Sequence, residues 1–257
     1  MGKRNRPVAP RSGSAAPLRP GAQDAIAQSL QLGLEHHRAG RLQQAEIVYR
    51  EVLRRDPDNA EALHLLGRIA LSAGHLDHAE GCIERAAMLK PRSFVYHKSA
   101  AEVLRARGRR DEAIARYQRA LKLDPASAEA HNNLGNLLDE AGQLDAAIRH
   151  LERAVALSPD LAEAHNNLGV CLDRSGLGSR AREHFQRAIA LRPDYAEAIF
   201  NDAKALTGQG RLEDAKRVYE AGLRLQPGNA DGRLGYGIAH LLGGELEQGW
   251  EHYEARP

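Results

Sequence analysis

Asparagine side chains recur at a fixed spacing in the second half of the chain. Asn133, Asn167 and Asn201 are each 34 residues apart. Three neighbouring asparagines that accompany this series are Asn132, Asn136 and Asn166. The amide of each offers both a donor and an acceptor, which match the C=O and N–H of a peptide bond. A row of such amides can hold an extended chain by its backbone, with little demand on the sequence of that chain.

The other residues with reactive side chains form no recognisable site. His97, His131 and His165 also repeat at 34 residues, whereas metal binding needs several imidazoles that converge on one point. His75 and His78 alone supply too few ligands, so packing is the expected role of the histidines and no metal or cofactor is predicted. No glycine-rich phosphate loop follows a strand, and no serine or cysteine stands beside a histidine in a known catalytic arrangement. The chain is therefore predicted not to be an enzyme.

The elements that carry these side chains are predicted to be short amphipathic helices. Apolar residues at spacings of three and four indicate one helix over about 128–140 and a second over about 144–157. Gly142 separates the two helices, and Pro159 ends the pair. Gly135 is expected where the helices press together, because a bulky side chain there would hold the axes apart.

This pair of helices is repeated along almost the whole chain. The terminating prolines and the turn glycines recur every 34 residues at Pro57, Pro91, Pro125, Pro159, Pro193 and Pro227, and at Gly40, Gly74, Gly108, Gly142, Gly176, Gly210 and Gly244. The pattern resembles the tetratricopeptide repeat (TPR) family, which has this period and these offsets. The resemblance implies an all-α fold, a right-handed α-solenoid of about seven helix-turn-helix repeats. The predicted array covers 23–257, with repeats at 26–59, 60–93, 94–127, 128–161, 162–195 and 196–229, and a partial repeat at 230–257.

The resemblance also places a binding surface, because the first helices of a TPR array line its concave face. It implies a protein-interaction scaffold that binds an extended peptide or partner, with Asn132, Asn133, Asn136, Asn166, Asn167 and Asn201 as the peptide-binding residues. A second interpretation is that these amides bridge adjacent repeats. Five carboxylates are expected beside the asparagines, and they are Glu129, Glu163, Glu197, Asp139 and Asp173. The groove is therefore predicted to be acidic and to prefer neutral or basic segments.

Two further hypotheses come from particular stretches. HNNLGN and HNNLGV are similar to the TPR arm of O-linked N-acetylglucosamine transferases, and GELEQGWEHYEARP looks like the closing repeat of bacterial TPR-glycosyltransferase proteins. The alternative function is therefore a substrate-recruiting N-terminal arm of a glycosyltransferase whose catalytic domain is absent from this chain. A third hypothesis is self-association through the last repeat, whose apolar residues would lie open without a cap.

Charge and composition restrict the class of partner. The formal net charge is +2, and five basic residues with no acid in 1–22 leave the remainder at −3. A mildly acidic array argues against nucleic acid, and no apolar run approaches the ~20 residues of a membrane span. The Pro- and Arg-rich segment 1–22 is predicted to be a disordered tail. Cys82 and Cys171 lie far apart in the repeats and are predicted to be free thiols in a cytoplasmic protein.

Overall fold

The computed structural model describes residues 20–254, and side chains from 23 to 253. This part of the chain consists of fourteen α-helices in seven consecutive pairs, with no strand among its described residues. The helices are α1 (Pro20–Arg38), α2 (Leu42–Arg55), α3 (Ala60–Ser72), α4 (Leu76–Leu89), α5 (Phe94–Ala106), α6 (Arg110–Leu123), α7 (Ala128–Glu140), α8 (Leu144–Leu157), α9 (Ala162–Arg174), α10 (Gly178–Leu191), α11 (Ala196–Gly208), α12 (Leu212–Leu225), α13 (Ala230–Leu242) and α14 (Leu246–Glu254).

A glycine turn reverses the chain between the two helices of each pair. Gly142 follows α7 with a φ of +74°, a left-handed conformation that residues with a Cβ rarely adopt. The start of α7 is fixed by Ser127, whose Oγ accepts a hydrogen bond from the backbone N–H of Ala130 at 3.3 Å. This cap satisfies one of the amide groups that the first turn of a helix leaves without a partner.

Small residues let the two helices of a pair approach closely. A Cβ atom added to Gly135 would stand 2.6 Å from Cγ of Leu151 and 3.2 Å from the carbonyl oxygen of Ala147. Ala147 and Leu151 are completely buried. A larger residue at position 135 would therefore force the helices apart, which is the packing that the sequence predicted.

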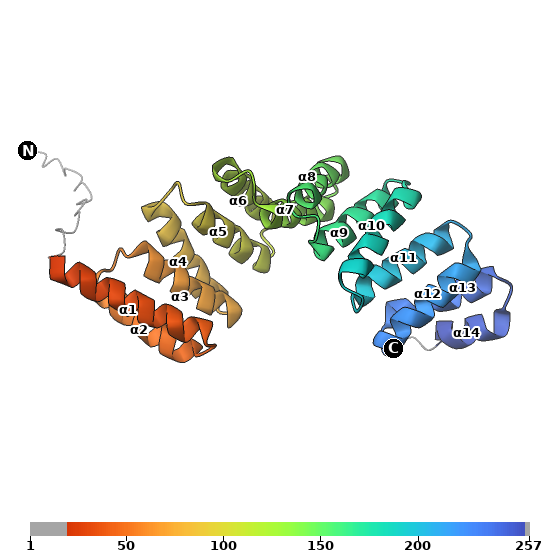
Figure 1. Ribbon diagram of the computed structural model, residues 1–257, viewed down its shortest axis with the longest axis horizontal. Helices are drawn as coiled ribbons and strands as arrows, with labels where there is room; N and C mark the ends of the chain where they lie inside the picture. The colour runs from red at the N-terminus through yellow and green to blue at the C-terminus, as the bar shows by residue number, and fades with distance from the viewer. Residues whose placement is uncertain (1–19, 255–257) are drawn as a thin grey trace, which may run out of the picture.

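Successive pairs stack side by side into an arch (Figure 1). Each second helix packs against its own partner and against the first helix of the next pair, as α8 does against α9, and α9 also contacts the first helices α7 and α11. The largest cluster of buried residues runs from Ala101 of α5 to Ala205 of α11. No single core has to grow with chain length, because each pair buries its apolar faces on its neighbours. The predicted all-α solenoid of about seven repeats is confirmed.

The first helix begins earlier than the repeat pattern indicated. α1 starts at Pro20, within the segment 1–22 that was assigned to the tail and six residues before the predicted start of repeat one at Ile26. Proline at the first position of a helix is favourable, because its fixed φ suits the helix and its missing N–H would have no partner there. Residues 1–19 of the predicted tail lie outside the described residues.

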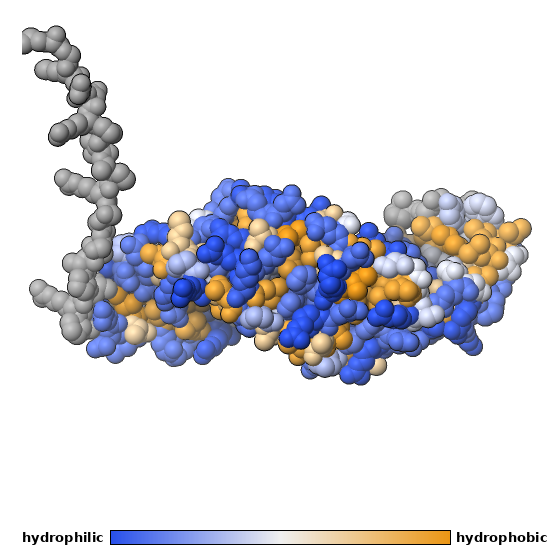
Figure 2. Space-filling view, turned by 90° about the horizontal axis from the view of Figure 1, so that it is seen from above, coloured by the Kyte–Doolittle hydropathy of each residue, from blue (hydrophilic) through white to orange (hydrophobic). Residues whose placement is uncertain are grey.

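The last pair leaves apolar side chains open at the end of the arch. Leu242, Leu246 and Trp250 are 62%, 61% and 50% exposed, and Figure 2 shows apolar surface at the C-terminal end. We call these three residues the apolar end patch.

Cys82 and Cys171 are both free and buried, as predicted. None of the described helices is long and apolar enough to span a membrane.

Candidate functional site

The asparagines of the first helices join successive repeats by hydrogen bonds. Nδ2 of Asn167 on α9 donates to Oδ1 of Asn132 on α7 at 3.0 Å. The same bond recurs one repeat later, where Nδ2 of Asn201 on α11 donates to Oδ1 of Asn166 on α9, also at 3.0 Å. Bridging of adjacent repeats, the second interpretation of these residues, is therefore an observed role. We call Asn132, Asn133, Asn166, Asn167 and Asn201 the asparagine ladder.

The six predicted peptide-binding residues differ in their access to solvent. Asn166 is completely buried, and Asn132 is only 8% exposed. Asn166 also donates to Oε1 of Glu197 at 3.0 Å, so its amide is held on both sides by the next repeat. Four of the six, Asn133, Asn136, Asn167 and Asn201, are half-buried and keep part of their surface open. Direct peptide contact by these four stays a prediction, whereas Asn132 and Asn166 are placed to support the others.

The asparagine ladder ends on both sides where the repeated residue changes. One repeat before Asn133 the equivalent residue is Ser99, whose Oγ lies 2.9 Å from Nε2 of His64. One repeat after Asn201 it is Gly235, which has no side chain to continue the series. Asn133 at the first end donates instead to the hydroxyl of Tyr117 at 3.3 Å. The ladder is therefore confined to α7, α9 and α11.

A hollow of about 690 Å³ opens where the asparagine ladder stops. Two aromatic rings contribute to its wall, Phe200 from α11 and Tyr219 from α12, with their centroids 6.4 Å apart. A Cβ atom on Gly235 would meet Tyr219 Oη at 2.4 Å, and one on Gly232 would meet Cε1 of Phe200 at 2.5 Å. The two glycines of α13 thus make room for the rings. We define the aromatic hollow by its residues Phe200, Asn201, Tyr219, Leu234, Gly235 and Ile238.

Sequence reasoning missed the aromatic hollow, although a signal for it was present. Gly232 stands where the preceding repeats have Ala198 and Ala164, and Gly235 stands where they have asparagine. Two glycines within a helix cost stability relative to alanine, about 0.5–1 kcal/mol each in a helix interior, and so suggest a close approach. The rings that approach them could not be identified without the fold.

Basic side chains from neighbouring elements pair with the carboxylates beside the ladder. Glu129 accepts from Lys98, at 2.5 Å between Nζ and Oε2, and Glu163 pairs with Arg192. The prediction of an acidic groove is therefore wrong at these two positions. The charged residues that line the aromatic hollow are Asp173, Lys204 and Asp231, and no ion pair of theirs is found among the described side chains. Glu197 is exposed and accepts from the neutral amide of Asn166, and it too has no ion pair among these side chains.

The repeated histidines have the packing role that was expected. Nε2 of His131 lies 3.2 Å from the carbonyl oxygen of Pro125, and its Nδ1 lies 2.9 Å from Nδ1 of His150. His165 repeats this arrangement with His184, at 3.0 Å between the Nδ1 atoms. Burial lowers the pKa of all four imidazoles. Across residues 20–254 no group of three or more His, Cys, Asp or Glu side chains could hold a metal ion.

Family models cover most of the chain. Models described as tetratricopeptide repeat match residues 36–102, 134–196 and 200–255, and a model described as TPR repeat matches residues 101–142. No protein of curated function matches the chain in sequence.

Solved structures share the same architecture. MamA is 25% identical, with a TM-score of 0.58, and the match covers 64% of this chain and 96% of that one. YrrB, described as a TPR protein with an unusual peptide-binding site, is 21% identical with a TM-score of 0.61, over 72% of this chain and 95% of that one. PilF of Pseudomonas aeruginosa is 19% identical with a TM-score of 0.63, over 90% of both chains. The two likenesses below 25% identity show the fold alone.

Proposed function

Since the chain belongs to the tetratricopeptide repeat family, we propose that it is a non-enzymatic scaffold that binds an extended segment of a protein partner. The segment lies along the half-exposed asparagines and inserts one apolar side chain into the aromatic hollow. The observation that carries this proposal is the position of the hollow, which opens directly beside Asn201 at the end of the asparagine ladder.

The half-exposed amides retain capacity for a peptide backbone. A side-chain amide has two N–H hydrogens and one carbonyl oxygen. Asn167 and Asn201 each use an N–H for the bond to the preceding repeat. That bond also fixes the orientation of the amide, so little rotamer freedom is lost when a ligand binds. Preorganised amides of this kind suit an extended segment whose own N–H and C=O groups need partners.

The aromatic hollow supplies what the amides lack, which is selectivity for a side chain. Phe200 and Leu234 are half-buried, and Ile238 is 37% exposed, so apolar surface is available to a ligand. Covering it removes apolar area from water at about 25 cal/mol per Å². Tyr219 is almost fully buried beneath them and forms a firm wall. We therefore expect an aromatic or large aliphatic side chain in the bound segment.

The charges around the hollow favour a basic residue next to that side chain. Asp173 and Asp231 contribute two carboxylates to the lining, against the single ammonium group of Lys204. The bound segment is thus proposed to combine one apolar anchor with an adjacent Lys or Arg. This is narrower than the neutral or basic segment expected from the sequence.

The proposal is tested by selecting ligands from a library of random short peptides displayed on phage. Enrichment of peptides with an apolar residue beside a basic one is expected. Calorimetry with a selected peptide should then show that Ile238→Glu weakens the dissociation constant by about tenfold or more, because a carboxylate would have to be buried by the apolar anchor. Failure to enrich any peptide would overturn the scaffold function.

A matched control separates the hollow from a general effect of added charge. Leu242→Glu introduces the same carboxylate on the same helix, α13, at an exposed residue that does not line the hollow. Its affinity for the peptide should equal that of the unaltered chain. Equal loss in the two variants, or no loss in Ile238→Glu, would show that the anchor does not enter the aromatic hollow.

The other partners and functions expected from the sequence carry less support. The solved structures above give no support to a glycosyltransferase arm, which stays a hypothesis. A protein partner is preferred to nucleic acid, because the chain after residue 22 carries a net charge of −3 once the five basic residues before it are removed from the total of +2.

A further inference from the structure

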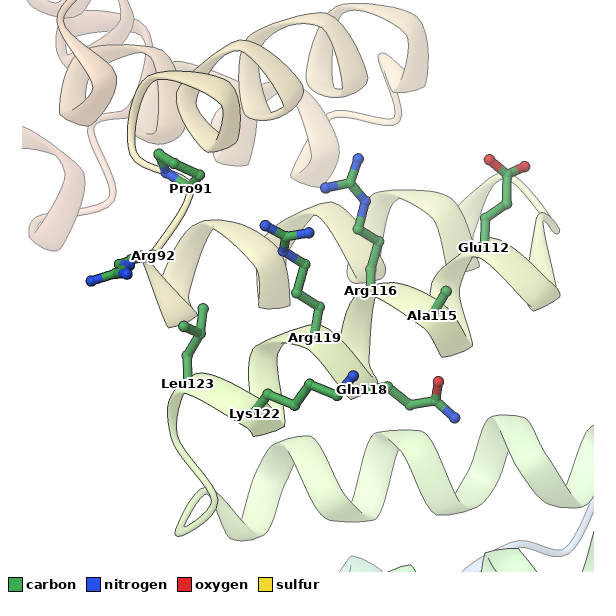
Figure 3. A pocket seen from close by; sticks show the side chains of 9 residues that line it. All are labelled: Pro91, Arg92, Glu112, Ala115, Arg116, Gln118, Arg119, Lys122 and Leu123. Atoms are coloured by element: carbon green, nitrogen blue, oxygen red, sulfur yellow. The ribbon is translucent and has the colours of Figure 1, made fainter.

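A second hollow, of about 730 Å³, lies between the second helix of repeat three, α6, and the loop that leads into α5 (Figure 3). Basic side chains dominate its lining. Arg116, Arg119 and Lys122 come from α6, and Arg92 comes from the loop before α5. Figure 3 shows Arg119 directed toward the loop that carries Pro91, with Arg92 and Lys122 extending to either side of it, whereas Arg116 points toward α4, where it pairs with Glu84. We call Arg92, Arg119 and Lys122 the basic triad.

At the equivalent place, two other repeats hold an aspartate and an arginine 27 residues apart, whereas repeat four has Ala126 before Arg153 and repeat six has Asp194 before Ala221. In repeat two, Nη2 of Arg85 donates to Oδ1 of Asp58 at 2.6 Å, across 27 residues of sequence. In repeat five, Arg187 is again 27 residues after an aspartate, and its charge helps to lower the pKa of Asp160, after the larger effect of hydrogen bonds within the loop.

Repeat three reverses the charge of one member of this pair. Arg119 is the equivalent of Arg85, and the residue 27 positions before it is Arg92 instead of an aspartate. The aspartate and arginine that pair in repeat two are thus replaced by two arginines that line one hollow. An anion placed in the hollow would attract both groups.

The carboxylates close to the hollow do not neutralise the basic triad. Glu112 accepts hydrogen bonds from Nε and Nη2 of Arg109, both at 2.7 Å. Glu84 is paired with Arg116 at 2.6 Å. No carboxylate of the described side chains lies within ion-pair distance of Arg92, Arg119 or Lys122. Arg119 instead donates its Nε–H toward Nε2 of His97 at 3.2 Å, which leaves its two Nη groups for a ligand.

We propose that this hollow binds a phosphorylated side chain of a partner protein, with the phosphate held by the basic triad. A phosphate monoester carries about −1.5 to −2 charges at neutral pH and presents three acceptor oxygens. Two guanidinium groups can each offer it a pair of N–H donors, and the ammonium group of Lys122 adds a point charge. The site goes beyond the proposed peptide groove, because it is built from other helices and other residues.

Apolar residues beside the triad favour a protein segment over a nucleic acid. Pro91 and Leu123 line the same hollow, and Leu123 is 38% exposed. They can contact the side chain that neighbours the phosphorylated residue, whereas a nucleic-acid backbone would need a longer basic surface.

The test is a titration of the full chain, followed by NMR of the arginine Nε–H groups. The probe is a short peptide with one phosphoserine next to leucine, and its unphosphorylated form and inorganic phosphate are titrated separately. Saturable shifts of the Arg92 and Arg119 signals are expected with the phosphopeptide alone at micromolar concentrations. Arg92→Asp should weaken this binding by about tenfold or more, because it restores the pair seen in Asp58 and Arg85.

Arg224→Asp is the matched control. Residue 224 occupies in repeat six the place that Lys122 has in repeat three, it is exposed, and its substitution changes the net charge equally. Binding by this variant should be unchanged. The proposal is overturned if Arg92→Asp binds as tightly as the unaltered chain, if both variants weaken equally, or if the unphosphorylated peptide binds equally well. Equal affinity for inorganic phosphate, or tighter binding of a short oligouridylate, would likewise refute a phosphorylated protein segment as the ligand.

Discussion

Replacing Asn166 by alanine should destabilise the array without any ligand being present. Asn166 is completely buried, accepts a hydrogen bond from Nδ2 of Asn201 and donates one to Oε1 of Glu197. Both partners belong to the next repeat, so Asn166→Ala removes polar contacts between repeats five and six. The asparagine ladder would then be interrupted at a single step.

The size of the effect follows from these two bonds. A hydrogen bond between neutral groups contributes about 1 kcal/mol, and one to a charged acceptor about 1.5–3 kcal/mol. We take about 1.5 kcal/mol for the bond to Glu197, because this carboxylate is exposed and water can solvate it when the bond is lost. Alanine gains about 0.5 kcal/mol over asparagine in helix propensity. The free energy of unfolding is therefore expected to fall by about 2 kcal/mol.

Urea unfolding followed by circular dichroism measures this loss, and Asn136→Ala is the control. Asn136 lies on the neighbouring first helix, is half-buried, and makes no side-chain hydrogen bond within the described part of the chain. Its replacement should leave the free energy of unfolding within about 0.5 kcal/mol of the original. A double-mutant cycle of Asn166→Ala with Asn201→Ala should give a coupling of about 1 kcal/mol, as expected for two residues that share a bond.

Two results would refute this reasoning. A loss below about 0.5 kcal/mol for Asn166→Ala would show that the bonds between repeats contribute little to stability. A loss for Asn136→Ala as large as that for Asn166→Ala would show that any asparagine of the first helices has the same effect. If the expected result is obtained, weaker peptide binding by Asn166→Ala is not evidence for direct contact, because the supporting step of the ladder has been removed.

Two further predictions concern pH and self-association. Burial lowers the pKa of His150 and His184 below the usual 6.5, so in acid the unfolded chain binds more protons than the folded chain. The free energy of unfolding should therefore decrease as the pH is lowered through about 6.5. Urea unfolding at several pH values should show a smaller decrease in a His150→Gln/His184→Gln double variant. An equal loss in the double variant would contradict this assignment. The apolar end patch predicts a molar mass that rises with concentration in light scattering, and Trp250→Glu should remove the rise; a monomer at all concentrations would exclude self-association.

The repeat architecture could be predicted because it depends on local and periodic features. The left-handed turn at Gly142 and the contact of Gly135 with Leu151 are fixed by residues close in sequence. The early start of α1 was missed because proline indicates a break within a helix, whereas Pro20 stands at the first position, where it is favourable.

The candidate site depends on contacts between repeats, which the sequence of one repeat does not contain. Asn166 and Asn167 are adjacent in sequence, yet one is buried and the other half-exposed, because the rotation between stacked pairs decides which side chain meets the next helix. The residues next to Glu129 in sequence do not show that its charge is neutralised, because its partner Lys98 comes from the preceding first helix, α5. The expected negative charge is therefore neutralised at Glu129 and at Glu163, whereas Glu197 and Asp173 have no ion pair among the described side chains.

Departures from the repeat are the more informative residues in a chain of this kind. A residue that recurs at every repeat can be explained by the bond it makes with its copy, as Asn201 is by Asn166. A residue that departs from the series cannot make this bond, so the neighbouring residues lack the partner that other repeats provide. Gly235 ends the asparagine ladder and leaves Tyr219 beside a hollow, and Arg92 removes the carboxylate that Arg119 would otherwise meet. The first exception costs stability through glycine in a helix, and the second leaves the guanidinium group of Arg119 without a carboxylate partner among the described side chains. A ligand that fills the hollow or neutralises the charge offsets that cost, so binding is expected at these two places before any other on the array.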